Sequence, residues 1–167
     1  MNKILAVAGP TASGKSDLAI NTALKYGGEI VSADSMQIYK GMDIGTAKAT
    51  EAERSAVAHH MIDFLSPLEN YSAEDYRADA MRALHEIESR GKGALFVGGT
   101  GLYMDSLIRG NDFAPVPATG HREILEAQLE QDGVDALLAR LQEIDPEAAE
   151  KSQGNPRRII RALVVYL

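Results

Sequence analysis

A glycine-rich stretch near the N-terminus constrains the fold more than any other part of the sequence. Residues Gly9 to Ser16 read GPTASGKS and fit the pattern G-x-x-x-x-G-K-[ST] of a phosphate-binding loop. The apolar run Ile4 to Ala8 precedes this loop and suits a buried parallel strand. Lys15 to Tyr26 then has the apolar spacing of a helix, ended by Gly27-Gly28. A strand, a loop and a helix in this order predict an α/β fold with a parallel sheet.

Each part of the loop has a physical role in binding phosphate. Glycines let the backbone curl so that successive N–H groups point inward, and the following helix adds the positive end of its dipole. Lys15 supplies a mobile positive charge, and the Ser16 hydroxyl can bind Mg²⁺. This pattern holds any diphosphate, so it does not say whether phosphate is transferred. The residues expected to bind phosphate are Gly9, Pro10, Thr11, Ala12, Ser13, Gly14, Lys15 and Ser16.

Strands and helices alternate as far as Ile108. Glu29 to Ala33 and Ala94 to Val97 are predicted strands. Ser72 to Arg90 is predicted to be a helix, since its apolar residues share one face and Ser72 with Asp75 suits its N-cap. Another helix follows the glycines after the third strand and runs through Ile108. The sequence therefore predicts a P-loop NTPase-like parallel sheet of three strands, flanked by helices.

After Asn111 the sequence changes character. A proline-rich connection leads to helical patterns at Arg122 to Gln131 and Val134 to Ile144, and Asn155-Pro156 opens a last helix. The chain stops at VVYL without a cap, and three strands make a thin sheet, so we expect a C-terminally truncated fragment. The predicted parts are a phosphate-loop core, a helical insertion and a return helix of the core, at residues 1–112, 113–152 and 153–167.

Composition and charge narrow the function classes. The net charge of −7 argues against broad electrostatic binding to nucleic acid. Arg157, Arg158 and Arg161 nevertheless crowd together, which favours a local phosphate contact. Cysteine is absent, so disulfides and thiolate metal sites are excluded. No apolar run approaches the roughly 20 residues that span a bilayer, and the N-terminus does not fit a secretory signal, so we expect no membrane contact and a cytoplasmic location.

Asp34 follows the second predicted strand, at the carboxyl edge of the expected sheet. Ligands of open α/β folds bind at this edge. A carboxylate beside a bound polyphosphate can hold Mg²⁺ or act as a general base. It can also cap the next turn through Ser35. The position of Asp34 in the sequence leaves these roles open.

Five longer strings of the sequence carry a more specific signal. They are SADSMQIYKGMDIGTAK, HHMIDFLSP, YSAEDYRADA, VGGTGLY and NPRRIIRAL, and with GPTASGKS they span the chain. In this order they resemble the tRNA isopentenyltransferase (tRNA dimethylallyltransferase) family. The resemblance implies a phosphate-loop core with an inserted helical domain. It also implies transfer of a dimethylallyl group from dimethylallyl diphosphate to N6 of the adenosine 3′ to the anticodon. Ala49 departs from the family, which usually has proline there.

The resemblance also assigns roles to residues. Gly9 to Ser16 would bind the diphosphate of the donor rather than ATP, with Mg²⁺ as cofactor on Ser16. Asp34 would be the base for N6, Thr100 would contact the substrate near the reaction centre, and Lys15 would neutralise the leaving diphosphate. A monomer acting on the anticodon stem-loop is implied. The matching tRNA-contacting positions are Asp34, Ser35, Met36, Gln37, Thr100, Arg122, Arg157, Arg158, Ile159, Ile160 and Arg161.

Several other polar residues have plainer interpretations. Neighbouring residues diverge on a helix or strand, so His59 and His60 cannot easily share one metal ion, and we expect them to pack or hydrogen-bond instead. Lys40 and Lys48 suit either tRNA phosphate or a solvated surface. Three tyrosines could stack on a base, but a partly buried structural role is favoured for Tyr39, Tyr71 and Tyr103.

Three alternatives to the tRNA-modifying enzyme remain. An ATP-dependent small-molecule kinase could use the same loop, but only the cluster Arg157 to Arg161 could serve as its arginine-bearing lid. Adenylate isopentenyltransferase uses the same donor with a free nucleotide, whereas the helical insertion favours a bulky acceptor. A binding module without turnover is the third alternative, and the retained Asp34, Lys15 and Thr100 argue against it.

Overall fold

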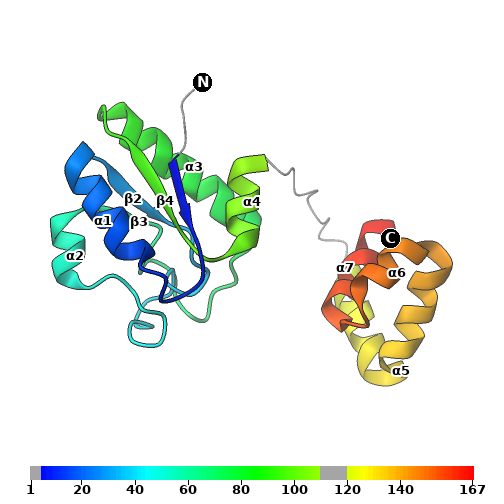
Figure 1. Cartoon of the computed structure of the whole chain (residues 1–167). Helices are drawn as coiled ribbons and strands as arrows, with labels where there is room; N and C mark the ends of the chain where they lie inside the picture. The colour runs from blue at the N-terminus through cyan, green and yellow to red at the C-terminus, as the bar shows by residue number, and fades with distance from the viewer. Residues whose placement is uncertain (1–4, 110–119) are drawn as a thin grey trace. The chain divides into compact units, whose positions relative to one another are not determined.

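The computed structural model describes residues 5–109 and 120–167, which fall into two compact units (Figure 1). The first unit, Met1–Phe113, holds a sheet with its helices, and the second unit, Ala114–Leu167, is helical. Across the described residues, no helix has both the length and the apolar character needed to cross a membrane.

The first unit is built on a parallel sheet of four strands in the order β1-β4-β2-β3. The structure confirms the α/β fold and the three predicted strands. It adds the short β3, which pairs with β2 through only two residues and so left no periodic signal in the sequence. The bounds of the strands are β1 (Leu5–Ala8), β2 (Glu29–Ser32), β3 (His59–His60) and β4 (Ala94–Gly98).

Helices cover both faces of this sheet (Figure 1). Successive side chains of a strand point to opposite faces, so β2 sends Ile30 to one face and Val31 to the other. Ile30 packs with Ala19 and Ala23 of α1, whereas Val31 packs with buried side chains of α3 and α4 such as Tyr76. The helices of this unit are α1 (Lys15–Tyr26), α2 (Glu51–Ala56), α3 (Ala73–Ser89) and α4 (Gly101–Arg109).

Two helix ends follow signals that the sequence carries. Helix α1 has its predicted bounds and ends at Gly27, whose φ of 67° is the left-handed conformation that glycine adopts without strain. Helix α3 begins with a capping box, in which Ser72 accepts a hydrogen bond from the Asp75 N–H and Asp75 accepts one from the Ser72 N–H. The predicted N-cap of this helix is confirmed.

The second unit packs three helices around its own apolar core. Helix α5 is interrupted at Gly133, where φ is 80° and ψ is 173°, between the two helices that the sequence predicts. The helices are α5 (His121–Ile144), α6 (Pro146–Ser152) and α7 (Pro156–Tyr166). The buried core consists of Leu125, Leu137, Leu141, Ala149, Ile159, Ile160, Leu163 and Val164.

The segment 153–167, predicted to return to the phosphate-loop core, contains helix α7. Helix α7 belongs to the second unit and packs against α5 and α6. The reason is its apolar face, because Ile159 and Leu163 are fully buried against leucines of α5.

A buried carboxylate joins β2 to its neighbours at the end of the sheet opposite the phosphate loop. Glu29 is 3% exposed and accepts hydrogen bonds from His60 (2.6 Å), Arg90 (2.8 Å) and Lys92 (2.8 Å). His59 Nδ1 lies 2.8 Å from the carbonyl oxygen of Val57, so both histidines hydrogen-bond as expected. Burial alone would raise the pKa of Glu29, but the hydrogen bonds from Lys92, His60 and Arg90 lower it to about 2.

Glu29→Gln is expected to reduce the free energy of unfolding by about 3 kcal/mol at pH 7, the equivalent of lowering the carboxyl pKa from 4.5 to about 2. A depressed pKa stabilises the fold above about pH 4.5, and this contribution is lost as the pH falls toward 2. Urea unfolding of both proteins between pH 7 and pH 3 measures it. Stability curves that stay parallel through this window would contradict the assignment.

Candidate functional site

The phosphate loop connects β1 to α1 and has the backbone that anion binding requires. Ala12 (φ 62°) and Gly14 (φ 79°) both adopt the left-handed conformation, which turns successive N–H groups to the inside of the loop. Gly14 is the N-cap of α1 and no side chain of the described residues caps that helix. The Lys15 ammonium donates to the Pro10 carbonyl, so its charge lies over the loop. The N–H groups of the first turn of α1 are therefore available to an anion.

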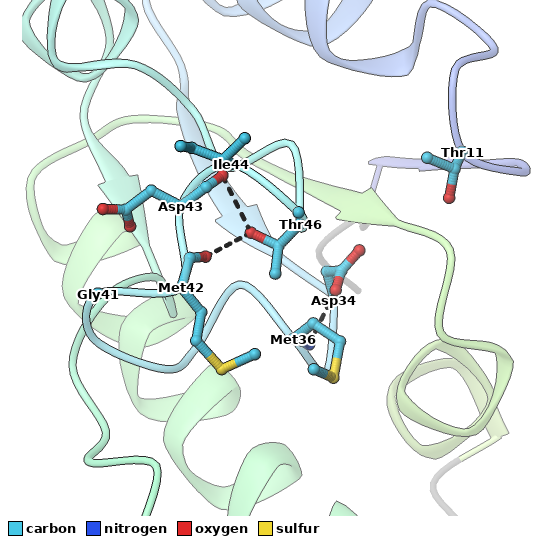
Figure 2. Close-up of a pocket in the computed structure, with 9 residues that line it drawn as sticks. Thr11, Asp34, Met36, Gly41, Met42, Asp43, Ile44 and Thr46 are labelled. Carbon is cyan, nitrogen blue, oxygen red and sulfur yellow. Dashed lines mark hydrogen bonds between the residues drawn. The ribbon is translucent and has the colours of Figure 1, made fainter.

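Asp34 lies directly after β2, at the carboxyl edge of the sheet. Its Oδ1 accepts hydrogen bonds from the N–H groups of Met36 (2.9 Å) and Gln37 (3.4 Å). The turn-capping role left open by the sequence is confirmed, although it runs through Met36 and Gln37 and not through Ser35. Oδ2 takes no part in this turn. One carboxylate oxygen thus fixes the orientation of the side chain while the other faces the site (Figure 2).

The end of β4 brings Thr100 beside Asp34. Thr100 Oγ1 accepts a hydrogen bond from the Ser35 N–H at 2.9 Å, and the Thr100 N–H donates to the Ala33 carbonyl at 3.2 Å. Gly98 permits this approach, because a Cβ at that position would lie 2.1 Å from the Ala33 oxygen. The predicted site residues Asp34, Ser35 and Thr100 therefore form one contiguous group.

Two cavities meet at Asp34. The smaller one, of about 80 Å³, is lined by Lys15 and Ser16 of the phosphate loop and by Gly98 of β4. The larger one, of about 530 Å³, opens beside it and is largely apolar (Figure 2). Both are lined by Thr11, Asp34 and Thr46, so a ligand could place an anionic group in one and an organic group in the other. The larger cavity is lined by Thr11, Asp34, Met36, Gly41, Met42, Asp43, Ile44, Gly45 and Thr46.

Most of the larger cavity is formed by residues that were not predicted as site residues. The segment 41–46 supplies six of the lining residues, among them Met42 and Ile44. Ile44 is 98% exposed. An apolar side chain within the glycine-bounded string GMDIG was the signal available in the sequence, since exposed apolar groups beside polar sites suit ligand binding.

Gln37 and Lys48 have roles that the sequence did not indicate. The Gln37 side-chain amide donates to the carbonyls of Thr46 (3.1 Å) and Ala47 (3.2 Å), so it holds the cavity segment. The Lys48 side chain is only 1% exposed and forms ion pairs with Asp43 (2.7 Å) and Asp63 (2.8 Å). The interpretation of Lys48 as a surface or phosphate-binding lysine is wrong, because its ammonium is buried and fully engaged inside the protein.

Two buried tyrosines stack on each other, and one of them hydrogen-bonds to the end of β2. The rings of Tyr76 and Tyr103 lie parallel with centroids 3.8 Å apart, and the Tyr76 hydroxyl donates to the Ser32 carbonyl at 3.0 Å. Burial raises the pKa of Tyr103 to about 12, with smaller contributions from Tyr39 and Asp34. Tyr71 donates to Asp79 at 2.9 Å. The structural interpretation of Tyr71 and Tyr103 is confirmed.

The predicted tRNA-contacting residues of the second unit divide by exposure. Arg157, Arg158 and Arg161 are exposed near the start of α7, and together with Lys151 they line a cavity of about 490 Å³. Arg122 is exposed on α5 and pairs with Glu126 at 2.9 Å. Ile159 and Ile160, also predicted to contact tRNA, are 0% and 5% exposed and pack in the apolar core of the second unit. They hold α7 in the core and leave the arginines at the surface.

Comparison with known proteins identifies the family. A family model described as IPP transferase matches residues 37–167. A tRNA dimethylallyltransferase 2 from Geotalea uraniireducens is 48% identical over 98% of this chain and 53% of its own length. The chain belongs to the IPP transferase family. The predicted family is confirmed.

Solved structures of the family share the fold. The full-length tRNA isopentenylpyrophosphate transferase from Bacillus halodurans is 42% identical with a TM-score of 0.67, over 99% of this chain and 55% of that one. A eukaryotic dimethylallyltransferase acting on tRNA is 32% identical with a TM-score of 0.84, over 99% of this chain and 42% of that one. The chain spans about half the length of the curated relatives it matches.

Proposed function

We propose that the protein transfers a dimethylallyl group from dimethylallyl diphosphate to N6 of the adenosine 3′ to the tRNA anticodon. The observation that carries this proposal is the pair of cavities that meet at Asp34. A phosphate-loop cavity opens beside a larger apolar one, which suits a donor with a diphosphate at one end and a hydrocarbon at the other. Relatives named as tRNA dimethylallyltransferases support the choice of reaction.

Residues Gly9 to Ser16 bind the donor diphosphate in this proposal. The C–O bond between the allylic carbon and the diphosphate breaks, and negative charge grows on the departing oxygens. The Lys15 ammonium and the N–H groups at the start of α1 neutralise that charge where it develops. Stabilising the leaving group requires no transfer of phosphate, so the loop supports prenyl transfer without acting as a kinase.

Asp34 takes a proton from N6 of the adenine as the new C–N bond forms. An amine conjugated to a purine is a poor nucleophile, so a carboxylate within reach should accelerate the attack. The hydrogen bonds from Met36 and Gln37 to Oδ1 hold the carboxyl group, which leaves Oδ2 to accept the proton. Thr100 contacts the substrate near the reaction centre in this proposal. Its hydroxyl lies 3.3 Å from the hydroxyl of Ser35, the residue that follows Asp34.

Mg²⁺ is the proposed cofactor, held by Ser16. Ser16 and Asp34 line the same small cavity, and hydroxyl and carboxylate oxygens are ligands that Mg²⁺ accepts. Among the described residues no group of three or more His, Cys, Asp or Glu side chains could hold a metal, so phosphate oxygens and water would complete the shell. When bound, the ion would add positive charge beside the leaving diphosphate.

The second unit supplies the tRNA contacts in this proposal. Arg157, Arg158 and Arg161 stand at the surface of an acidic protein, and guanidinium groups pair well with phosphate. Arg122 is the further proposed contact. We propose that a cytoplasmic monomer binds the anticodon stem-loop, with the target adenosine splayed out of the loop so that it can reach the site.

The proposal is tested first by calorimetry. A non-hydrolysable dimethylallyl diphosphate analogue and ATP are titrated with Mg²⁺ into separate samples of the protein, and we expect the prenyl compound to bind more tightly. Transfer from labelled dimethylallyl diphosphate is then measured with a tRNA anticodon stem-loop and with free AMP as acceptors. Label should reach the stem-loop.

Each of the other outcomes would favour one of the alternative functions. Tighter binding of ATP would overturn the proposal in favour of a kinase. Transfer to AMP without transfer to the stem-loop would assign the protein to adenylate isopentenyltransferases. Donor binding without transfer to either acceptor would support a binding module.

A further inference from the structure

The wall of the larger cavity is a segment that contributes no residue to the apolar clusters of the described residues. Residues 41–46 supply six of its nine lining positions. Both ends of the segment have left-handed backbone, at Gly41 (φ 73°) and Ala47 (φ 48°). Ile44 in the middle is almost entirely exposed. The shape of the wall must therefore depend on polar contacts with neighbouring parts of the chain.

Gln37 makes such contacts at one end of the wall, and Lys48 makes another through Asp43. Its ammonium donates to the Tyr39 carbonyl (2.7 Å) and lies 2.7 Å from Asp43 Oδ1 and 2.8 Å from Asp63 Oδ1. An ammonium has three N–H donors, so these three acceptors saturate it. Burial would lower the pKa of Lys48, but the hydrogen bonds to Asp43 and Asp63 raise it, and the group stays charged. It has no donor left to offer a substrate.

The contacts of Lys48 connect the wall to a part of the fold that is held independently. Asp43 belongs to the wall, whereas Asp63 lies on the segment that follows β3. That segment is hydrogen-bonded to residues 37–40, through Asp63 N–H to the Gln37 carbonyl (3.0 Å) and Lys40 N–H to the Leu65 carbonyl (2.8 Å). Lys48 thus joins the wall to a segment that has hydrogen bonds of its own to residues 37–40.

We propose that Lys48 is a positioning residue that acts through Asp43 to hold segment 41–46 as a wall of the cavity beside Asp34. This inference rests on the proposed function for the substrate concerned, which is the donor whose hydrocarbon end occupies the larger cavity. Without Lys48 the wall samples open conformations, and the donor binds only to the fraction of molecules in which the wall is in place. Lys48 makes no described hydrogen bond to the phosphate loop, so the diphosphate site itself is unaffected.

The matched variants are Lys48→Met, Lys48→Arg and Arg54→Met. Methionine keeps the length of the stem and removes the charge, and arginine keeps the charge. Arg54 pairs with Asp63 Oδ2 at 3.2 Å but does not touch the wall, so Arg54→Met is the control for a weakened support. Asp43→Asn removes the charge of the other partner in the Lys48–Asp43 ion pair. Because the Asp43 side chain is 63% exposed, this variant should fold, and it replaces Lys48→Met if that protein does not.

Two readouts decide the inference. Hydrogen–deuterium exchange should accelerate in the peptide covering residues 41–48 of Lys48→Met and stay unchanged in α3, and Lys48→Arg should restore part of the protection. In steady-state kinetics the KM for the donor should rise about tenfold, with the KM for tRNA and kcat within roughly twofold, the pattern of a reduced competent fraction. Arg54→Met should show neither change.

The inference and the proposed function can fail separately. Unchanged exchange of residues 41–48 in both Lys48→Met and Asp43→Asn would overturn the positioning role whatever reaction the protein catalyses. Equal losses in every kinetic constant for Lys48→Met and Arg54→Met would also overturn it, since this pattern indicates general destabilisation. A wild-type protein that transfers nothing to tRNA would refute the proposed function, while the exchange measurement would still decide the role of Lys48.

Discussion

Asp34→Asn is expected to lower the rate of transfer to tRNA by about 10²–10⁴-fold, the usual contribution of a general base. The change is nearly isosteric. The amide oxygen can still accept from the N–H groups of Met36 and Gln37, so the turn after β2 should persist. What is lost is the ability to take a proton from the adenine amine. Single-turnover transfer from labelled donor measures the effect on the chemical step directly.

The control is Asp105→Asn, which removes the same charge from the same unit. Asp105 is exposed on α4, pairs with Arg109 at 3.5 Å and lines neither cavity at the site. Its transfer rate should stay at the wild-type value. Donor binding by Asp34→Asn should fall much less than the rate. If Asp34→Asn kept more than about a tenth of the rate, the general-base role would be wrong and Asp34 would be left as a turn cap.

Local signals explain why the elements of the first unit could be predicted. The phosphate-loop pattern, the glycine at position 27 and the pairing of Ser72 with Asp75 each act over a few residues. In the structure they give a loop with left-handed backbone at Ala12 and Gly14, the end of α1 and the N-cap of α3. Runs of apolar residues located the three longer strands. These features depend on backbone geometry and on burial of one face, which neighbouring residues in the sequence largely determine.

The parts that escaped prediction depend on partners far along the chain. Lys48 is a polar residue in a polar loop, and only the positions of Asp43 and Asp63 in space bury its charge. Strand β3 consists of only two residues, and these adopt the strand conformation because they pair with β2. Whether the apolar face of α7 packs on the sheet or on α5 is likewise undetermined by its periodicity. Contacts of this kind require the fold before they can be assigned.

Gly98→Ala is expected to reduce the free energy of unfolding by about 3 kcal/mol or more, in the range of severe overpacking. An added Cβ would lie 2.1 Å from the Ala33 oxygen and 2.4 Å from the Ala33 carbonyl carbon. Both atoms are backbone, so no side-chain rotation relieves the clash and β2 must move away from β4. This shift would weaken the hydrogen bond from Ala33 N–H to the Val97 carbonyl, now 2.8 Å long. Urea unfolding measures the loss.

Gly93→Ala is the matched control, because it makes the same chemical change just before the other end of β4. A Cβ at Gly93 would meet no atom within 4 Å, so its stability should change by less than about 1 kcal/mol. The two sites also differ in what they position. Asp34 follows Ala33 directly, so a shift of β2 moves the carboxylate relative to the phosphate loop. We expect Gly98→Ala to lose transfer activity even at temperatures where it remains folded. Full activity in a folded Gly98→Ala protein would show that the close approach of β4 to β2 does not set the position of Asp34.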